Sequence, residues 1–125
     1  MKNGLNWFEI PVKDFDRANK FYSTILGADL TPWEMGGAKL GMFPGDREGV
    51  SGAIIAGEGA NEPCDKGTTV YLNCDGILDE ALSKVEAAGG KIVVPKMLVS
   101  DDIGHIGIVI DTEGNKVGLH SPMRK

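Results

Sequence analysis

Apolar residues recur at helical spacing shortly after the start of the chain. The run follows an extended segment, residues 6–12, and stops at Gly27. Its apolar positions are Phe15, Ala18, Phe21, Tyr22, Ile25 and Leu26. Spacings of three and four residues put these side chains on one face of a helix. Asp14 before the run and Gly27 after it are typical of helix caps. The pattern therefore predicts a strand followed by a capped amphipathic helix.

The same pattern returns about sixty residues further along the chain. Residues 69–74 have strand character, Asp75 is placed to cap a helix, and a second apolar stripe stops at Gly89. The members of this stripe are Ile77, Ala81, Leu82, Val85 and Ala88. An offset of this size is too long for a solenoid repeat. It indicates two copies of one module.

Three segments with strand character follow each predicted helix, separated by glycine, proline and asparagine turns. They are residues 28–34, 38–43 and 51–56 in the first half and residues 91–98, 106–110 and 116–120 in the second. The sequence thus predicts one α+β domain of two βαβββ modules. A ferredoxin-like βαββαβ fold is the alternative, but it leaves strands unassigned in both halves.

The domain is expected to occupy residues 1–125, with module one at 1–57, a linker at 58–67 and module two at 68–125. The linker is rich in glycine, proline and charge. A length of 125 residues suits one domain with its own core.

The net charge, the apolar runs and the cysteines of the chain limit the partners and the cellular compartment that we expect for the protein. A formal net charge of −5 repels phosphate backbones, so no nucleic-acid partner is expected. No apolar run is long enough to span a membrane, and the first residues lack the features of a signal peptide. Cys64 and Cys74 have no metal-site or redox spacing, which favours free thiols in a reducing compartment. We expect a cytoplasmic protein with no membrane partner.

Two motifs at opposite ends of the chain resemble a known superfamily. They are WFEIPVKDFDRANKFYSTILG, residues 7–27, and DTEGNKVGLHS, residues 111–121. Both are similar to segments of the glyoxalase, bleomycin-resistance and extradiol-dioxygenase superfamily, also called vicinal-oxygen-chelate proteins. The resemblance implies that the two modules form a curved mixed sheet, a cup, with the helices outside. Many members are homodimers, and a homodimer would also protect exposed sheet edges.

The resemblance also implies where metal ligands would lie, on the first and fourth strands of each module. The matching positions here are Trp7, residues 52–54, Thr69 and Gly118, and none has a metal-binding side chain. The four strands otherwise offer Glu9, His120 and the thiol of Cys74. A catalytic divalent metal usually needs about three protein ligands. The expectation is therefore no metal site and no cofactor.

Alternation along the strands assigns the candidate site residues to the inside of the cup. Trp7 shares a strand face with Glu9, Thr69 with Tyr71 and Asn73, and Gly118 with His120. The predicted ligand-binding residues are Trp7, Thr69, Tyr71, Asn73 and Gly118. The predicted catalytic residues are Glu9, as a base with its pKa raised by burial or as a counter-charge, and His120 as a proton carrier.

Two functions remain open. The first is metal-independent binding of a small organic molecule, with Trp7 and the acidic surface favouring a cationic aromatic ligand. The second is a lyase or isomerase in which Glu9 or His120 moves a proton next to a carbonyl. Structural roles are alternatives for the same residues: Trp7 in the core, Glu9 in a surface ion pair and His120 with no role in a site.

Overall fold

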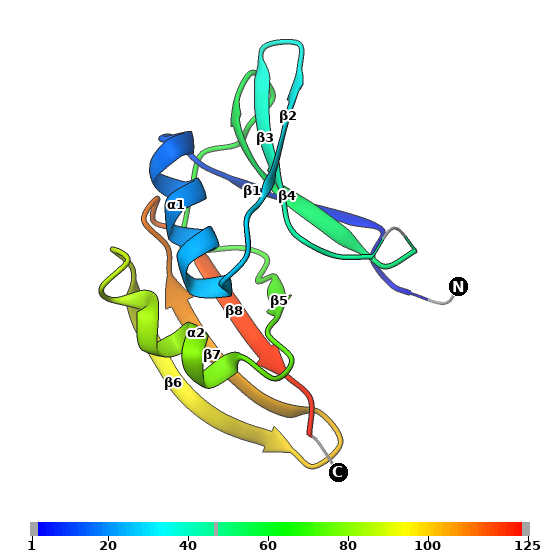
Figure 1. Ribbon diagram of the computed structural model, residues 1–125, viewed down its shortest axis with the longest axis vertical. Coiled ribbons are helices and arrows are strands. Elements are labelled where there is room, and N and C mark those ends of the chain that lie inside the picture. The colour runs from blue at the N-terminus through cyan, green and yellow to red at the C-terminus, as the bar shows by residue number, and fades with distance from the viewer. Residues whose placement is uncertain (1–2, 47, 124–125) are drawn as a thin grey trace.

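The computed structural model describes residues 3–46 and 48–123, and it contains both predicted modules (Figure 1). Module one comprises β1 (Trp7–Pro11), α1 (Phe15–Leu26), β2 (Thr31–Met35), β3 (Ala38–Met42) and β4 (Ser51–Gly57). Module two comprises β5 (Tyr71–Asn73), α2 (Leu78–Val85), β6 (Lys91–Ser100), β7 (Gly104–Ile110) and β8 (Lys116–Ser121). The α+β class and the repeated βαβββ order are confirmed.

The strands are divided between two four-stranded mixed sheets with matching topology. The orders are β1-β4-β3-β2 and β5-β8-β7-β6. In each sheet the first and last strands of the module pair in parallel and the other pairs are antiparallel. Within the described part of one chain no barrel is closed. The expected curved sheet is present as two halves, which Figure 1 shows diverging from the region where α1 and α2 lie side by side.

Helix α1 begins and ends where its caps predict. The Asp14 carboxylate accepts a hydrogen bond from the Arg17 amide at 3.0 Å, and Gly27 ends the helix in the left-handed conformation with φ of 66°. The residues that α1 buries are Ala18, Phe21, Tyr22 and Ile25.

Helix α2 begins later than its sequence predicts. Ile77 is its N-cap and makes no side-chain capping bond, so the expectation that Asp75 caps this helix is wrong. Gly76 adopts a φ of 77°, and the Asp75 amide donates to the Asn73 side-chain oxygen at 2.9 Å. This turn separates Asp75 from the first helical residue.

Each helix packs on one face of its own sheet, the two helices pack against each other, and both share one hydrophobic core. Residues from the helix-covered face of sheet one, such as Ile10 and Ile54, pack in the same cluster as Leu72 and Leu119 from sheet two. We call the opposite face of each sheet its helix-free face. A smaller cluster of Ala38, Leu40, Ala53 and Ile55 lies on the helix-free face of sheet one.

A buried polar network in the β7–β8 turn, residues 111–115, joins the modules. The Tyr22 hydroxyl of α1 donates to the Asp111 carboxylate at 2.6 Å. Burial, together with the Asp111 charge, raises the pKa of Tyr22 well above its usual value, so the hydroxyl keeps its proton. The Asn115 side-chain amide donates to the Pro11 carbonyl at 2.7 Å and accepts from the Cys64 amide at 3.1 Å.

Glu113 extends this network to the start of α1. Its side chain is fully buried and accepts hydrogen bonds from the amides of Lys13 and Asp14 at 2.9 and 2.8 Å. The Arg17 guanidinium donates to the same carboxylate at 2.7 and 3.1 Å. Burial alone would raise the pKa of Glu113, but these bonds and that of Thr112 hold it at about 2. Module two thus supplies an anionic partner for the N-terminus of α1.

Candidate functional site

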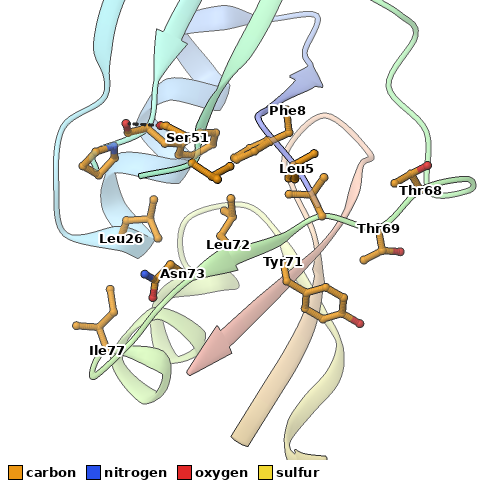
Figure 2. Close-up of a pocket in the computed structure, with 14 residues that line it drawn as sticks. Leu5, Phe8, Leu26, Ser51, Thr68, Thr69, Tyr71, Leu72, Asn73 and Ile77 are labelled. Carbon is orange, nitrogen blue, oxygen red and sulfur yellow. Dashed lines mark hydrogen bonds between the residues drawn. The ribbon is translucent and has the colours of Figure 1, made fainter. Parts of the chain in front are cut away.

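A cleft of about 530 Å³ lies where the two modules diverge (Figure 2). This volume falls in the range of known small-molecule sites. The cleft is lined by Leu5, Phe8, Leu26, Phe43, Pro44, Val50, Ser51, Thr68, Thr69, Val70, Tyr71, Leu72, Asn73 and Ile77. Module one and the edge strand β5 of module two therefore provide its facing walls.

The wall from module one is built around two aromatic rings. Phe8 and Phe43 pack with ring centroids 5.6 Å apart. Gly52 leaves the space that the Phe8 ring occupies, because a Cβ atom at this glycine would lie 2.5 Å from the ring. Figure 2 shows Phe8 and Leu5 directed toward the same space as Leu26. The wall is thus apolar and fixed by strand pairing between β1 and β4.

The polar groups of the cleft are few. The Ser51 hydroxyl donates to the Phe43 carbonyl at 3.3 Å, the dashed line in Figure 2. The Asn73 side-chain oxygen accepts from the Asp75 amide. Thr68, Thr69 and Tyr71 bring hydroxyl groups to the lining. An apolar cavity with a few polar groups is the usual composition of a small-molecule site.

Three of the predicted ligand-binding residues, Thr69, Tyr71 and Asn73, lie in this lining. Gly118 lies beside it. It pairs with Tyr71 across the parallel strands β5 and β8, and a Cβ atom at Gly118 would lie 2.2 Å from the Tyr71 ring. The absence of a side chain at Gly118 therefore leaves room for the Tyr71 ring.

Trp7 and Glu9 share the helix-free face of sheet one, as alternation along β1 predicts. The Trp7 indole donates to the Glu9 carboxylate at 3.3 Å, and Trp7 as a whole residue is 41% exposed. Glu9 is exposed as well and lines a separate hollow of about 230 Å³ beside the linker. A single chain does not supply the burial that a basic role for Glu9 requires.

His120 lies on the helix-free face of sheet two, opposite Ile106 in β7. Its Nε2 atom is 2.6 Å from the Ile103 carbonyl in the β6–β7 turn. His120 is half-buried and does not line the cleft. The two predicted catalytic residues, Glu9 and His120, thus lie on different sheets, and neither lines the cleft.

Most of the cleft lining was missed from sequence. The missed residues are Leu5, Phe8, Leu26, Phe43, Pro44, Val50, Ser51, Thr68, Val70, Leu72 and Ile77. Their side chains are mainly apolar, so the spacing of apolar residues along the sequence predicts them as core residues. The angle between the two modules decides which of these residues face the cleft. The spacing of apolar residues along the chain does not indicate that angle.

The residues present do not fit a metal site. Trp7, Thr69 and Gly118 stand at the positions where the resemblance implies ligands, and β4 has only small or apolar side chains at residues 52–54. Within residues 3–46 and 48–123, no three His, Cys, Asp or Glu side chains are grouped closely enough to hold a metal ion. Cys64 and Cys74 are free thiols, and burial raises the pKa of Cys74 to about 11.

Comparisons with known proteins agree with the fold. A family model described as bleomycin resistance protein-like N-terminal matches residues 5–38. The proteins named "Putative glyoxylase CFP32" of Mycobacterium bovis and Mycobacterium tuberculosis are each 28% identical over 116 residues, which is 91% of this chain and 44% of theirs. The chain therefore spans less than half the length of these curated relatives.

Solved structures extend the similarity over nearly the whole chain. A glyoxalase/bleomycin resistance protein from Albidiferax ferrireducens superposes with a TM-score of 0.70 at 17% identity, covering 97% of this chain and 100% of that one. The fosfomycin resistance protein FosX from Listeria monocytogenes gives a TM-score of 0.66 at 18% identity, covering 98% and 96%. No helix among the described residues is long and apolar enough to cross a membrane. The chain thus has the fold of glyoxalase/bleomycin resistance proteins, and its sequence is similar to the bleomycin resistance protein-like N-terminal family over residues 5–38.

Proposed function

We propose that this protein binds a small organic molecule in the cleft between its modules and that binding does not require a metal ion. The observation that carries the proposal is the cleft itself, a largely apolar space of about 530 Å³ with walls from two modules. Those modules are held together by the buried contacts of Asp111, Glu113 and Asn115. A cavity with pre-formed walls binds a ligand without the cost of ordering them.

The family offers a second function, a lyase or isomerase that transfers a proton next to a carbonyl. A general base or acid must come within hydrogen-bonding reach of the reacting atom. Glu9 and His120 lie outside the cleft lining, so binding is the function better supported. Their roles in proton transfer stay predictions, as do a cytoplasmic location and the absence of a nucleic-acid partner.

Filling the cleft tests the proposal. Thr69 is half-buried in the lining and makes no side-chain hydrogen bond to the described residues. Thr69→Trp should place an indole in the cavity and weaken binding of the neutral dye N-phenyl-1-naphthylamine about tenfold or more. Dye fluorescence, excited beyond the tryptophan absorption, gives the dissociation constant.

Thr31→Trp is the matched control, because Thr31 is exposed on the edge strand β2 and outside the cleft. Its dye affinity should equal that of the unmodified protein. Equal affinities for both variants, with both folded by circular dichroism, would place the dye elsewhere and refute the proposed site.

Metal independence predicts a second result. Dialysis against EDTA should leave dye affinity unchanged, and excess Ni²⁺, Mn²⁺ or Zn²⁺ should not raise the melting temperature, because a ligand stabilises only a fold that binds it. A rise in melting temperature together with loss of dye binding after chelation would contradict this part of the proposal.

We also propose that two copies associate through their helix-free faces. On sheet one, Trp33 and Met35 are 50% and 53% exposed, and on sheet two Met97 is 45% exposed. Large apolar side chains gathered on one sheet face are typical of an interface. Multi-angle light scattering at micromolar concentration should give twice the mass of one chain, and Trp33→Glu should shift it toward the monomer. A single-chain mass for the unmodified protein would remove the proposal.

A further inference from the structure

Among residues 3–46 and 48–123, none that lines the cleft is Asp, Glu, Lys, Arg or His. Glu9, the predicted counter-charge, lines a different hollow. An ionised group that enters a largely apolar cavity loses its hydration and finds no counter-charge, which is costly. The lining therefore discriminates against ions of either sign.

One polar side chain in the lining is oriented by the fold and still has a donor to spare. The side-chain oxygen of Asn73 accepts from the Asp75 amide at 2.9 Å, which fixes the amide plane. The Nδ2 group of Asn73 makes no hydrogen bond to another residue in the described ranges 3–46 and 48–123. By contrast, the Ser51 hydroxyl already donates to a backbone carbonyl.

Asn73 is exposed on the edge strand β5, where it pairs with His120 of β8, and apolar side chains of the lining lie beside it. Figure 2 shows its side chain between Leu26 of α1 and Ile77, with Leu72 next to it on β5. A ligand whose apolar body packs on these residues can bring an oxygen to Nδ2. A donor at the end of an apolar wall gains most from an acceptor when water is displaced.

We infer that the cleft selects uncharged, mainly apolar ligands that carry a hydrogen-bond acceptor such as a ketone, aldehyde or ester oxygen, and that Asn73 Nδ2 donates to that acceptor. The inference rests on the proposed function, because it concerns the same cleft. It replaces the expectation of a cationic aromatic ligand, since Trp7 lies outside the lining.

Four naphthalene probes of similar shape test the ligand class. They are 2-acetylnaphthalene, 2-ethylnaphthalene, 2-naphthoate and (2-naphthyl)methylammonium, each measured at neutral pH by displacement of N-phenyl-1-naphthylamine. The ketone should bind tighter than either ion by on the order of tenfold or more. It should bind tighter than the ethyl compound by about three- to tenfold.

Asn73→Asp tests the donor. The aspartate can still accept from the Asp75 amide but cannot donate to a ligand. Affinity for the ketone should fall to that of the ethyl compound, and the ammonium probe should gain affinity, because the cleft now holds a carboxylate. A loss of fold would weaken all four probes together, so this reversal separates a specific role from a structural one. Asn61→Asp, at an exposed residue outside the lining, should leave every affinity unchanged.

The outcomes are distinguishable. If either ion binds as tightly as the ketone, the inferred ligand class is wrong, although the cleft still binds small molecules. If Asn73→Asp leaves the preference for the ketone intact, Asn73 is not the donor. If neither the dye nor any probe binds the unmodified protein, the proposed function fails and the inference fails with it.

Discussion

Asp111→Ala is expected to lower the free energy of unfolding by about 3–4 kcal/mol, because it leaves several buried donors without an acceptor. The Asp111 carboxylate accepts from the Tyr22 hydroxyl, from the amides of Glu113 and Asn115 and from the Asn115 side chain, at 2.6 to 3.0 Å. Tyr22 is fully buried, so its hydroxyl cannot turn to water. Urea denaturation followed by circular dichroism measures the loss.

Two further variants check the cause. Asp101→Ala removes the same group from an exposed position and should change stability by less than about 0.5 kcal/mol. Tyr22→Phe removes the donor, so combining it with Asp111→Ala should cost less than the sum of the two single changes. Additive effects would mean that the hydrogen bond between Tyr22 and Asp111 does not account for the loss.

Glu113→Gln is expected to destabilise the protein at neutral pH and to remove part of its sensitivity to acid. The pKa of Glu113 is about 2 in the folded chain, against an ordinary value of 4.5. Since the unfolded chain takes up the proton first, the stabilisation is complete above pH 4.5 and is lost as the pH falls from 4.5 toward 2. The shift corresponds to at most about 3 kcal/mol.

Thermal denaturation at pH values from 7 to 2.5 tests this result. The melting temperature of the unmodified protein should fall more steeply below pH 4.5 than that of Glu113→Gln. Glu62→Gln is the control, because Glu62 forms only an exposed ion pair with Lys13 at 3.4 Å, and such pairs contribute little. Parallel curves for Glu113→Gln and the unmodified protein would show that the buried carboxylate is not the titrating group.

The repeated order of elements was predictable because its signals are local. Helical spacing of apolar residues, Asp14 as a cap and Gly27 in the left-handed conformation all act within one turn of α1. The late start of α2 was not predictable from the aspartate alone, since Gly76 permits a turn after Asp75. The interpretation of one polar residue as a cap depends on the backbone that follows it.

The candidate site was predictable only in part. Alternation correctly separates Trp7 and Glu9 from the helix-covered residues Phe8 and Ile10. Tyr71 and Asn73 line the cleft because β5 is an edge strand, open to the space beside it. How the modules pack against each other depends on contacts between residues far apart in sequence, such as Asn115 with Pro11. No periodicity reports such contacts, so the apolar walls remained hidden within the predicted core.

Methyl NMR spectra recorded with 2-acetylnaphthalene test the central claim most directly. Leu26, Leu72 and Ile77 line the cleft. Leu40 and Ile55 lie on the helix-free face of sheet one, and Ile108 lies on that of sheet two, where it pairs with Gly118. The account predicts ligand-dependent shifts and intermolecular NOEs at the first three residues and none at the second three. Shifts confined to Leu40, Ile55 and Ile108 would contradict it.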